Sequence, residues 1–285
     1  MIFPRTVLAA LCALLAAAVP LYAEELISIH GTPVAAEPVV AAAAQIKKDA
    51  GLEFRIVTEG GNGGAVTSIG EEIAEVALLS RKMTPQEQAG WPDKPFHEVQ
   101  FGRQALLIVV PAQVWDSGIR AITKEQLRAI YEGRVKNWKA LGGDDRKIVF
   151  FNRDVRTSAW ELLMAFLYDD IRKAPLSEAE VLADSSDVTT AVEFNSGSIC
   201  VLEFAARKPA AVHALGIRLA DGSIAEPTAK EIAAGRYELS RPLIIATPRK
   251  PAGKVRRFVE FMLGPAGQSF LNKTGHLSNA DLEAK

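Results

Sequence analysis

Residues 26–79 decide the fold, and they read LISIHGTPVAAEPVVAAAAQIKKDAGLEFRIVTEGGNGGAVTSIGEEIAEVALL. Three short apolar runs in this stretch, at 26–29, 54–57 and 76–79, predict β-strands. Between the runs, apolar residues recur at the spacing of an α-helix: Val39, Ala43 and Ile46, and then Val66, Ile69 and Ile73. This strand–helix–strand–helix–strand order predicts an α/β fold in which helices cover a parallel sheet.

The same alternation continues toward the C-terminus. Further strands are predicted at 105–110, 148–151 and 243–246. Capping boxes, in which a hydroxyl residue stands three positions before Glu or Gln, predict helix starts at Thr123, Ser158, Ser177 and Thr228. A closing amphipathic helix is predicted from Val255, Phe258, Val259 and Met262. The order indicates two α/β units and a return of the chain to the first.

Composition narrows the class of protein. The 285 residues are 48% hydrophobic and 24% charged, which is a globular balance with room for one large domain or two ordinary ones. Lys plus Arg number 33 against 34 Asp plus Glu, so the basic excess of a general nucleic-acid binder is missing. The four histidines show no metal-ligand spacing, and we expect no metal and no organic cofactor.

The N-terminal segment predicts export. Arg5 precedes an apolar run at 7–19, and a cleavage site ending at Ala23 is followed by two glutamates. Residues 1–23 are therefore interpreted as a cleaved signal peptide, because the apolar run is too short for a comfortable membrane span. The mature chain then holds one cysteine, Cys200, which lies in an apolar run and is expected to be a small buried residue.

Loops after strands hold the candidate binding residues. Ligands of open parallel sheets bind where strands end and helices begin. Four such loops combine glycine amides, hydroxyls and arginines near predicted helix N-termini, which is a combination suited to an anion. The candidates are Gly31, Thr32, Asn62, Gly63, Ser80, Arg81, Arg153, Arg156, Thr157 and Ser158.

Each loop also has a plainer interpretation. The glycine run at 60–64 could be only a flexible turn, since it fits neither the nucleotide P-loop nor the dinucleotide spacing. Ser158 could serve only as a helix cap, and the arginines could simply be solvated. Catalysis is the least favoured class, because the chain has no G-x-S-x-G or H-E-x-x-H motif and Cys200 has no evident histidine partner. We expect no catalytic residues.

Two stretches, LRAIYEG at 127–133 and NWKALGG at 137–143, resemble a characteristic segment of the PstS-type phosphate-binding proteins, which are periplasmic solute-binding proteins. SRPL at 240–243 and the closing segment at 258–268 resemble the family as well. The resemblance implies a two-lobed periplasmic-binding-protein fold of type II, with a mainly parallel sheet and flanking helices in each lobe. Lobe 1 would comprise 24–110 plus 242–285, lobe 2 would comprise 111–241, and a two-strand hinge would join them.

The resemblance also implies a function. A periplasmic monomer would bind an inorganic oxyanion, phosphate first, in the cleft between the lobes and deliver it to an inner-membrane ABC permease. One departure keeps an alternative open: Arg156-Thr157-Ser158 stands where the family has Ser-Gly-Thr, so the glycine that lets backbone approach phosphate is Thr157 here. Arg81 likewise stands where one form of the family has an aspartate. The alternative is a protein with a degenerate cleft that acts as a sensor or interaction subunit.

Overall fold

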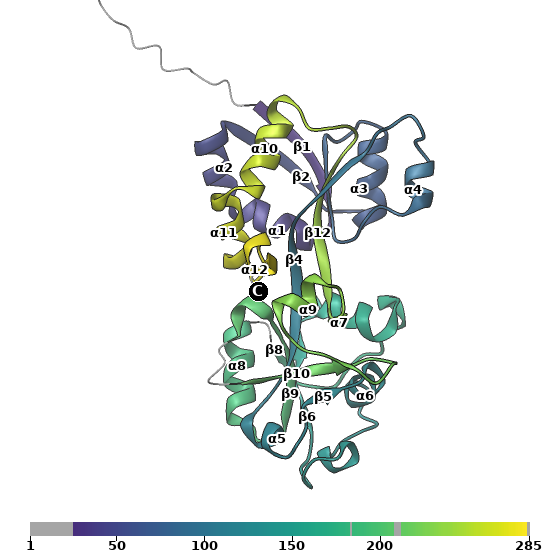
Figure 1. Ribbon diagram of the computed structural model, residues 1–285, viewed down its shortest axis with the longest axis vertical. Coiled ribbons are helices and arrows are strands. Elements are labelled where there is room, and N and C mark those ends of the chain that lie inside the picture. The colour runs from purple at the N-terminus through teal and green to yellow at the C-terminus, as the bar shows by residue number, and fades with distance from the viewer. Residues whose placement is uncertain (1–24, 183, 208–211, 284–285) are drawn as a thin grey trace, which may run out of the picture.

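A computed structural model describes residues 25–182, 184–207 and 212–283 of the chain (Figure 1). The predicted signal peptide at 1–23 lies outside the described residues. The strands are β1 (Glu25–Gly31), β2 (Leu52–Val57), β3 (Val76–Leu79), β4 (His97–Val110), β5 (Ala121–Ile122), β6 (Val149–Phe150), β7 (Asn152–Arg153), β8 (Val181–Leu182), β9 (Ser198–Glu203), β10 (His213–Arg218), β11 (Ile224–Ala225) and β12 (Ser240–Thr247).

The α-helices are α1 (Pro33–Ala41), α2 (Ala43–Ala50), α3 (Gly61–Gly70), α4 (Pro85–Ala89), α5 (Ala112–Asp116), α6 (Lys124–Tyr131), α7 (Ser158–Tyr168), α8 (Ser185–Phe194), α9 (Ala229–Ala233), α10 (Gly253–Leu263), α11 (Pro265–Lys273) and α12 (Asn279–Glu283). Short 3₁₀ helices are η1 (Trp138–Leu141), η2 (Ile171–Lys173) and η3 (Phe204–Ala206). The predicted α/β alternation is confirmed.

Strands β1, β2 and β3 pair in parallel, as the sequence predicts, and β1 lies between the other two. Gly31 explains how closely β1 and β3 approach, because a Cβ atom at this position would lie 2.6 Å from both the Cβ and the backbone oxygen of Leu78. On the far side of β3 the sheet continues antiparallel through β12 and then β4. The first unit is therefore a mixed sheet with a parallel edge.

Two long strands pass through the middle of the molecule (Figure 1). β4 pairs antiparallel with β12 from His97–Thr247 to Ala105–Ser240, with a register shift between Leu243 and Ile244. Beyond that point β4 pairs with β9 and β10. The strand predicted at 105–110 is thus the second half of a 14-residue strand that contributes to both ends of the molecule.

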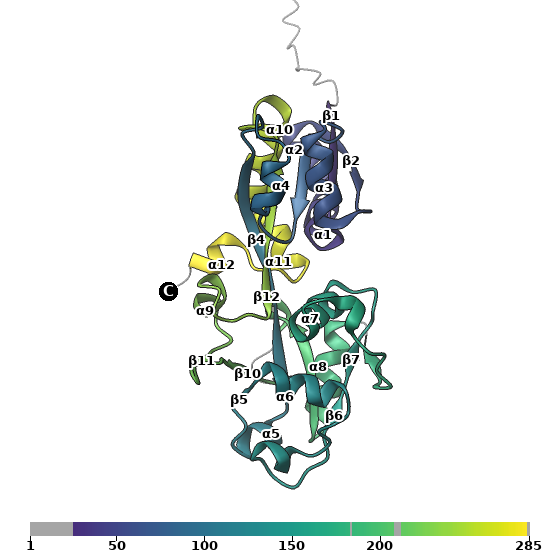
Figure 2. The same cartoon turned by 90° about the vertical axis from the view of Figure 1, so that its right-hand side faces the viewer.

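Hydrophobic side chains gather in separate clusters at the two ends. We use "lobe 1" for β1–β3, α1–α4, α10 and α11, whose main core is built from β1, α1, β12 and α10 and whose smaller core lies under α3. We use "lobe 2" for α5–α9 and β5–β11, which pack around the second half of β4. Figure 2 shows the two lobes above and below the paired β4 and β12. The lobe boundaries at 110/111 and 241/242 stay a prediction.

Three local expectations are corrected. α3 ends at Gly70, so Ile73 lies beyond the helix and its side chain is 59% exposed. The N-cap of α7 is Thr157 rather than Ser158, since the Thr157 hydroxyl accepts from the Trp160 amide at 3.2 Å. No helix begins at Ser177, whose hydroxyl accepts from the Ala179 amide in the segment before β8.

Other caps form as predicted. Thr123 and Gln126 make a complete capping box at α6, and the Thr228 hydroxyl accepts from the Glu231 amide at α9. The predicted closing helix is α10. Within 25–182, 184–207 and 212–283, no helix combines the length and apolar character needed to cross a membrane.

Candidate functional site

A cavity of about 800 Å³ is lined by residues of both lobes. Its wall on the lobe 1 side comes from the start of α1 and the end of α11. Its wall on the lobe 2 side comes from the starts of α7 and α8, from Arg153 and from the β9–η3 segment. The lining residues are Pro33, Val34, Glu37, Arg153, Arg156, Thr157, Ser158, Asp184, Ser185, Glu203, Ala205, Ala206, Asn272, Lys273, Thr274 and Gly275.

Three helices begin at this cavity. α1 starts with Pro33 behind the Thr32 N-cap, α7 starts with Ser158 behind Thr157, and α8 starts at Ser185. The first amides of a helix have no intrahelical acceptor, and the helix dipole places partial positive charge at the same end. The convergence of three such ends from two lobes favours an anion in the cavity.

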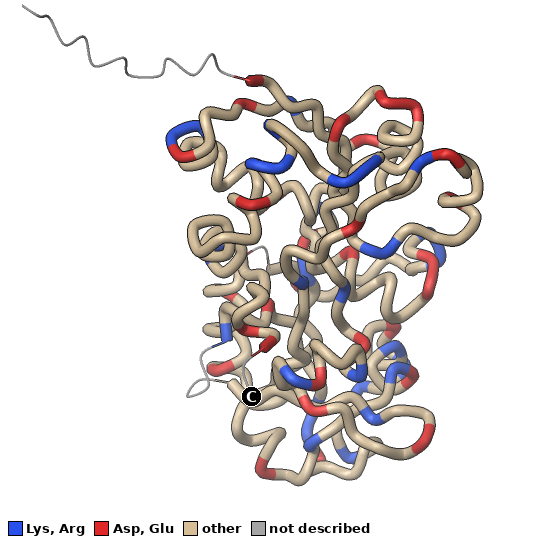
Figure 3. The backbone as a smooth tube through the Cα atoms, turned by 45° about the horizontal axis from the view of Figure 1, so that its top comes forward, with Lys and Arg blue, Asp and Glu red and all other residues tan. Residues whose placement is uncertain are grey.

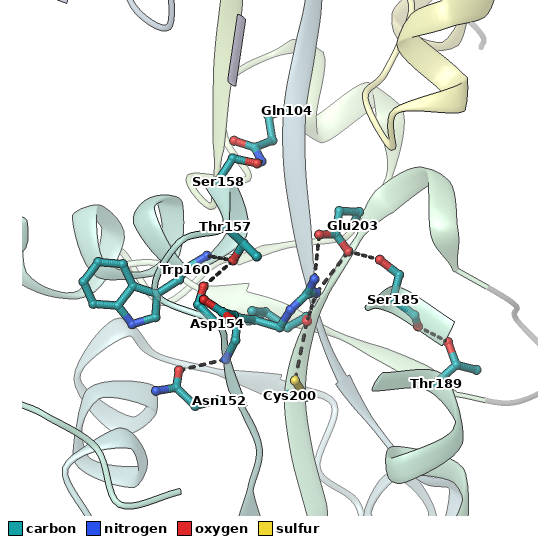
Figure 4. A network of polar contacts seen from close by, with 12 residues as sticks. Gln104, Asn152, Asp154, Thr157, Ser158, Trp160, Ser185, Thr189, Cys200 and Glu203 are labelled. Carbon is teal, nitrogen blue, oxygen red and sulfur yellow. Dashed lines mark hydrogen bonds and ion pairs between the residues drawn. The ribbon is translucent and has the colours of Figure 1, made fainter. Parts of the chain in front are cut away.

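Arg153 forms the buried floor of the site on the lobe 2 side. Its side chain is 2% exposed, and its two terminal nitrogens donate to the two carboxylate oxygens of Glu203 at 3.1 and 3.0 Å. Arg153 also donates to the backbone oxygen of Val201, while the Ser185 hydroxyl donates to Glu203 at 2.5 Å (Figure 4). This bidentate pair fixes the guanidinium and orients its remaining surface.

Two carboxylates of the cavity have pKa values that are shifted in opposite directions. Burial opposes the ionisation of Glu203, but the charge and hydrogen bonds of Arg153 and the Ser185 hydroxyl hold its pKa below the ordinary value. Burial and the negative charge of Glu203 raise the pKa of Glu37, which belongs to lobe 1. Two carboxylates from opposite lobes therefore influence one another, and their environments push the two pKa values in opposite directions.

Arg156 lies at the rim of the cavity. Its side chain is 85% exposed and pairs with Asp154 at 2.7 Å. Hydrogen bonds from the Arg156 side chain and backbone lower the pKa of Asp154 to about 2. Thr157, next to it, uses its hydroxyl as the cap of α7, so the side chain that replaces the family glycine is held by its own helix.

Ser158 connects the cavity to the paired strands. Its hydroxyl accepts from the Gln104 side chain of β4 at 2.8 Å (Figure 4). Gln104 in turn accepts from Arg241 of β12 at 2.9 Å, and Arg241 forms a bidentate pair with Glu161 of α7 at 3.0 and 3.2 Å. The N-terminus of α7 is therefore positioned by both strands that join the lobes.

The first loop of lobe 1 reaches the edge of the cavity. Thr32 is buried, and both its amide and its hydroxyl donate to the backbone oxygen of Leu78, at 2.8 and 3.5 Å. Pro33 and Val34, which follow it, line the cavity. Gly31 lies behind them in the contact with β3. This loop therefore contributes the N-terminus of α1 to the cavity, and it does not contribute the hydroxyl of Thr32, which is buried.

The second and third loops bind one another. The Asn62 side chain accepts from the Ser80 amide at 2.9 Å and donates to the Ser80 hydroxyl at 3.1 Å. Arg81 makes a bidentate pair with Glu87 of α4 at 2.8 and 2.7 Å. Within the described chain the cavity wall includes Arg153, Arg156, Thr157 and Ser158 but not Asn62, Gly63, Ser80 or Arg81. The second and third loops therefore lie outside this cavity wall, and the binding role of their residues stays a prediction.

Four acidic or C-terminal features of the wall were not among the residues predicted from the sequence. Glu37, Asp184 and Glu203 line the cavity, as does the segment 272–275 at the end of α11. His276 follows this segment at 1% exposure, and burial together with the positive charge of Arg241 lowers its pKa to about 4. A glycine at positive φ, Gly275, was the one available signal that the chain turns sharply there.

Cys200 is buried behind Arg153, as predicted, and burial raises the pKa of its thiol to about 12. Such a thiol has almost no thiolate at neutral pH and is a poor nucleophile. Among the described residues, no group of three or more His, Cys, Asp and Glu side chains is arranged to hold a metal ion.

Comparison with known proteins identifies relatives that share this architecture. The model of the PBP superfamily domain matches residues 18–266. The phosphate-binding protein PstS of Borreliella burgdorferi is 28% identical over 229 residues, which are 76% of this chain and 77% of the relative. The protein of the same name from Bacillus subtilis is 26% identical over 251 residues, covering 87% of this chain and 79% of the relative.

Solved structures agree on the fold. A possible phosphate binding protein from Planctomyces limnophilus superposes with a TM-score of 0.77 at 21% identity, covering 90% of this chain and 93% of that one. PstS from Borrelia burgdorferi superposes with a TM-score of 0.68 at 23% identity, covering 90% and 99%. The predicted fold class is thereby confirmed. Because the family model spans nearly the whole chain that forms the two lobes and the cavity, this protein belongs to the PBP superfamily.

Proposed function

We propose that this protein binds an inorganic oxyanion, phosphate first, in the cavity between the lobes and delivers it to an inner-membrane ABC permease. The observation that carries the proposal is the convergence of the N-termini of α1, α7 and α8 on a cavity that also contains Arg153 and Arg156. Amides and guanidinium groups are donors only, and they match the acceptor oxygens of a tetrahedral anion.

The names of the relatives support the same ligand. The curated proteins that match over most of this chain are named phosphate-binding proteins. A cleaved signal peptide at 1–23 would place the mature protein in the periplasm as a monomer. Lobes with boundaries at 110/111 and 241/242 would close on the anion by bending at β4 and β12, and the permease would recognise the closed form. The proposed role is binding, without catalysis and without a cofactor.

A second role is favoured by the charges of the wall. Both arginines at the cavity already pair with carboxylates, Arg153 with Glu203 and Arg156 with Asp154. Glu37 and Asp184 add further acidic groups to the lining. A cleft with these internal pairs would suit a sensor or interaction subunit that has lost anion binding, as the Thr157 departure suggests.

Calorimetry on the processed protein, stripped of ligand, tests the proposal. Phosphate, sulfate, molybdate and a phosphonate are titrated into wild type and into two variants with a new aspartate at a helix N-cap. Thr157→Asp retains an effective N-cap but places a full negative charge at the cavity, so phosphate affinity should fall at least about tenfold. Thr123→Asp makes the same change at the cap of α6, away from the cavity lining, and should leave affinity unchanged.

The outcomes separate the two roles. Phosphate binding that Thr157→Asp weakens and Thr123→Asp spares supports an anion receptor. Equal phosphate affinity in wild type and Thr157→Asp would show that phosphate does not bind at the N-terminus of α7. A folded wild-type protein that gives no heat with any anion would instead support the degenerate cleft.

A further inference from the structure

The C-terminal segment makes a third connection between the lobes. From the end of α11 onward it lines the cavity at 272–275, where a Cβ on Gly275 would stand 3.4 Å from Glu203 of lobe 2. It then pairs with β4, because Arg103 and Leu277 exchange two backbone hydrogen bonds of 3.0 and 2.8 Å. It finally ends in α12, which packs against α9.

α12 is anchored to lobe 1 by polar contacts. The Asn279 amide donates at 2.7 Å to Gln268 of α11, and Gln268 itself donates to the backbone oxygens of Phe101 and Met262. The start of α12 is closed by Asp281, which accepts from the Ser278 amide at 2.8 Å and from the Ser278 hydroxyl. These contacts move with α11 when the lobes move.

Leu277, just before α12, and Leu282 of α12 anchor the same C-terminal segment to lobe 2 by apolar contacts. Leu277 is 2% exposed and belongs to the hydrophobic core of lobe 2. Leu282 is half-buried against this core, which also contains Ile232 of α9. The short helix α12 therefore spans an interlobe contact that neither β4 nor β12 provides.

The position of this contact relative to the paired strands determines how it changes when the lobes close. Figure 2 shows α1 and α7 on one side of the paired strands, and α12 and α9 on the other. Bending at β4 and β12 that brings α1 toward α7 must separate elements on the opposite side. The cavity of about 800 Å³ has room for many water molecules of roughly 30 Å³ each, so the structure is open around a small ion.

We infer that α12 and α9 form a brace that stabilises the open arrangement and lowers the ligand affinity of the site. Closure gives up part of this apolar contact, so the closed, binding-competent population is smaller than it would be without the brace. Apparent affinity falls in proportion to that population. The inference on affinity rests on the proposed function, whereas the inference on lobe arrangement does not.

Two variants loosen the brace from its two ends. Leu282→Ala reduces the apolar contact with lobe 2, and Asp281→Ala removes the cap that holds the start of α12. Leu141→Ala is the matched control, since Leu141 is also half-buried against the lobe 2 core but belongs to η1. Melting curves establish that each variant is folded.

The first readout needs no ligand. Val40 of lobe 1 and Val155 of lobe 2 are 58% and 59% exposed, so both can be replaced by cysteine and spin-labelled, while Cys200 is buried. Electron–electron resonance then gives the interlobe distance distribution. Leu282→Ala and Asp281→Ala should move the unliganded distribution toward shorter distances, and Leu141→Ala should not. Distributions that coincide with wild type in both brace variants would refute the brace.

The second readout is phosphate titration. If the wild-type protein binds phosphate, the two brace variants should bind it roughly three- to tenfold more tightly, mainly through slower dissociation. Equal or weaker binding by both folded variants would overturn the effect on affinity. If wild type binds no phosphate, the proposed function fails, and the distance shift alone decides for or against the brace.

Discussion

The two lobes use the same kind of ion pair for different purposes. Arg81 in lobe 1 and Arg153 in lobe 2 each bind a glutamate in a bidentate manner. The Arg81 side chain is 40% exposed and its partner belongs to the capping box of α4, whereas Arg153 is 2% exposed and its partner lines the cavity. Figure 3 shows how charged residues are distributed over the chain as a whole. The position of each pair in the fold, rather than the residue types that form it, therefore decides whether the arginine lines the cavity.

The sharpest test of this comparison removes each arginine in turn. Arg153→Met leaves Glu203 buried without its cation and should cost about 3–5 kcal/mol of unfolding free energy. Arg81→Met should cost less, about 1 kcal/mol, because the Arg81 side chain is 40% exposed and its pair is partly screened by water. Urea unfolding at neutral pH measures both.

A double variant separates the loss of the Arg153–Glu203 ion pair from the loss of the packing of the Arg153 side chain. Adding Glu203→Gln to Arg153→Met removes the unpaired charge and should restore much of the lost stability. A double variant as unstable as Arg153→Met would show that the methylene packing of Arg153, and not its charge, is what the fold requires.

Glycines of the lobe 1 loops give the next largest contrast. Gly31→Ala forces a methyl group against Leu78 at 2.6 Å and should destabilise the protein by about 1–3 kcal/mol. Gly63→Ala meets no atom within 4 Å on helix α3 and should be neutral or stabilising by up to about 1 kcal/mol. Thermal unfolding followed by circular dichroism compares the two. Equal melting temperatures would contradict the close approach of β1 and β3.

The smallest expected effect is the pH dependence of the exposed pair. The Arg81 hydrogen bond lowers the pKa of Glu87 to about 2, below its unfolded value of 4.5. The stabilisation that the ionised Glu87 gives the folded protein is therefore complete above about pH 4.5, and it is lost as the pH falls toward 2. Wild type should exceed Glu87→Gln by less than about 1 kcal/mol at pH 7, and this difference should shrink in acid. If the stability difference between wild type and Glu87→Gln grew in acid, the pKa of Glu87 would be raised in the folded protein and not lowered.

Local signals in the sequence predicted local structure well. The Thr123–Gln126 box forms at α6, and the run at 76–79 coincides with β3. The Ser158 box failed by one position because Thr157, also a hydroxyl residue, stands three residues before Trp160 and accepts its amide. The Ser177 box failed because a hydroxyl and a glutamate at that spacing do not suffice without an apolar helical face after them.

The site was harder to predict because its contacts are distant in sequence. Glu203 lies 50 residues after Arg153, and neither residue's neighbours indicate the pairing. Arg81 was a reasonable candidate until the tertiary structure placed Glu87 within its reach. The C-terminal wall at 272–275 lies at the end of an ordinary amphipathic helix and has no motif of its own. Residue types predicted an anion site, but only the fold decides which candidates share a surface.

The course of β4 has a consequence for how the protein acquires its structure. The core of lobe 2 draws almost all its residues from 105–239, so it can assemble before the rest of the chain is available. Lobe 1 needs β12 beside β3 and α10 against β1, which are late segments. A chain that emerges N-terminus first should therefore complete lobe 2 before lobe 1. In a nascent chain that has emerged only as far as residue 239, hydrogen exchange should show protection in β9 and none in β1, and the reverse pattern would contradict this order.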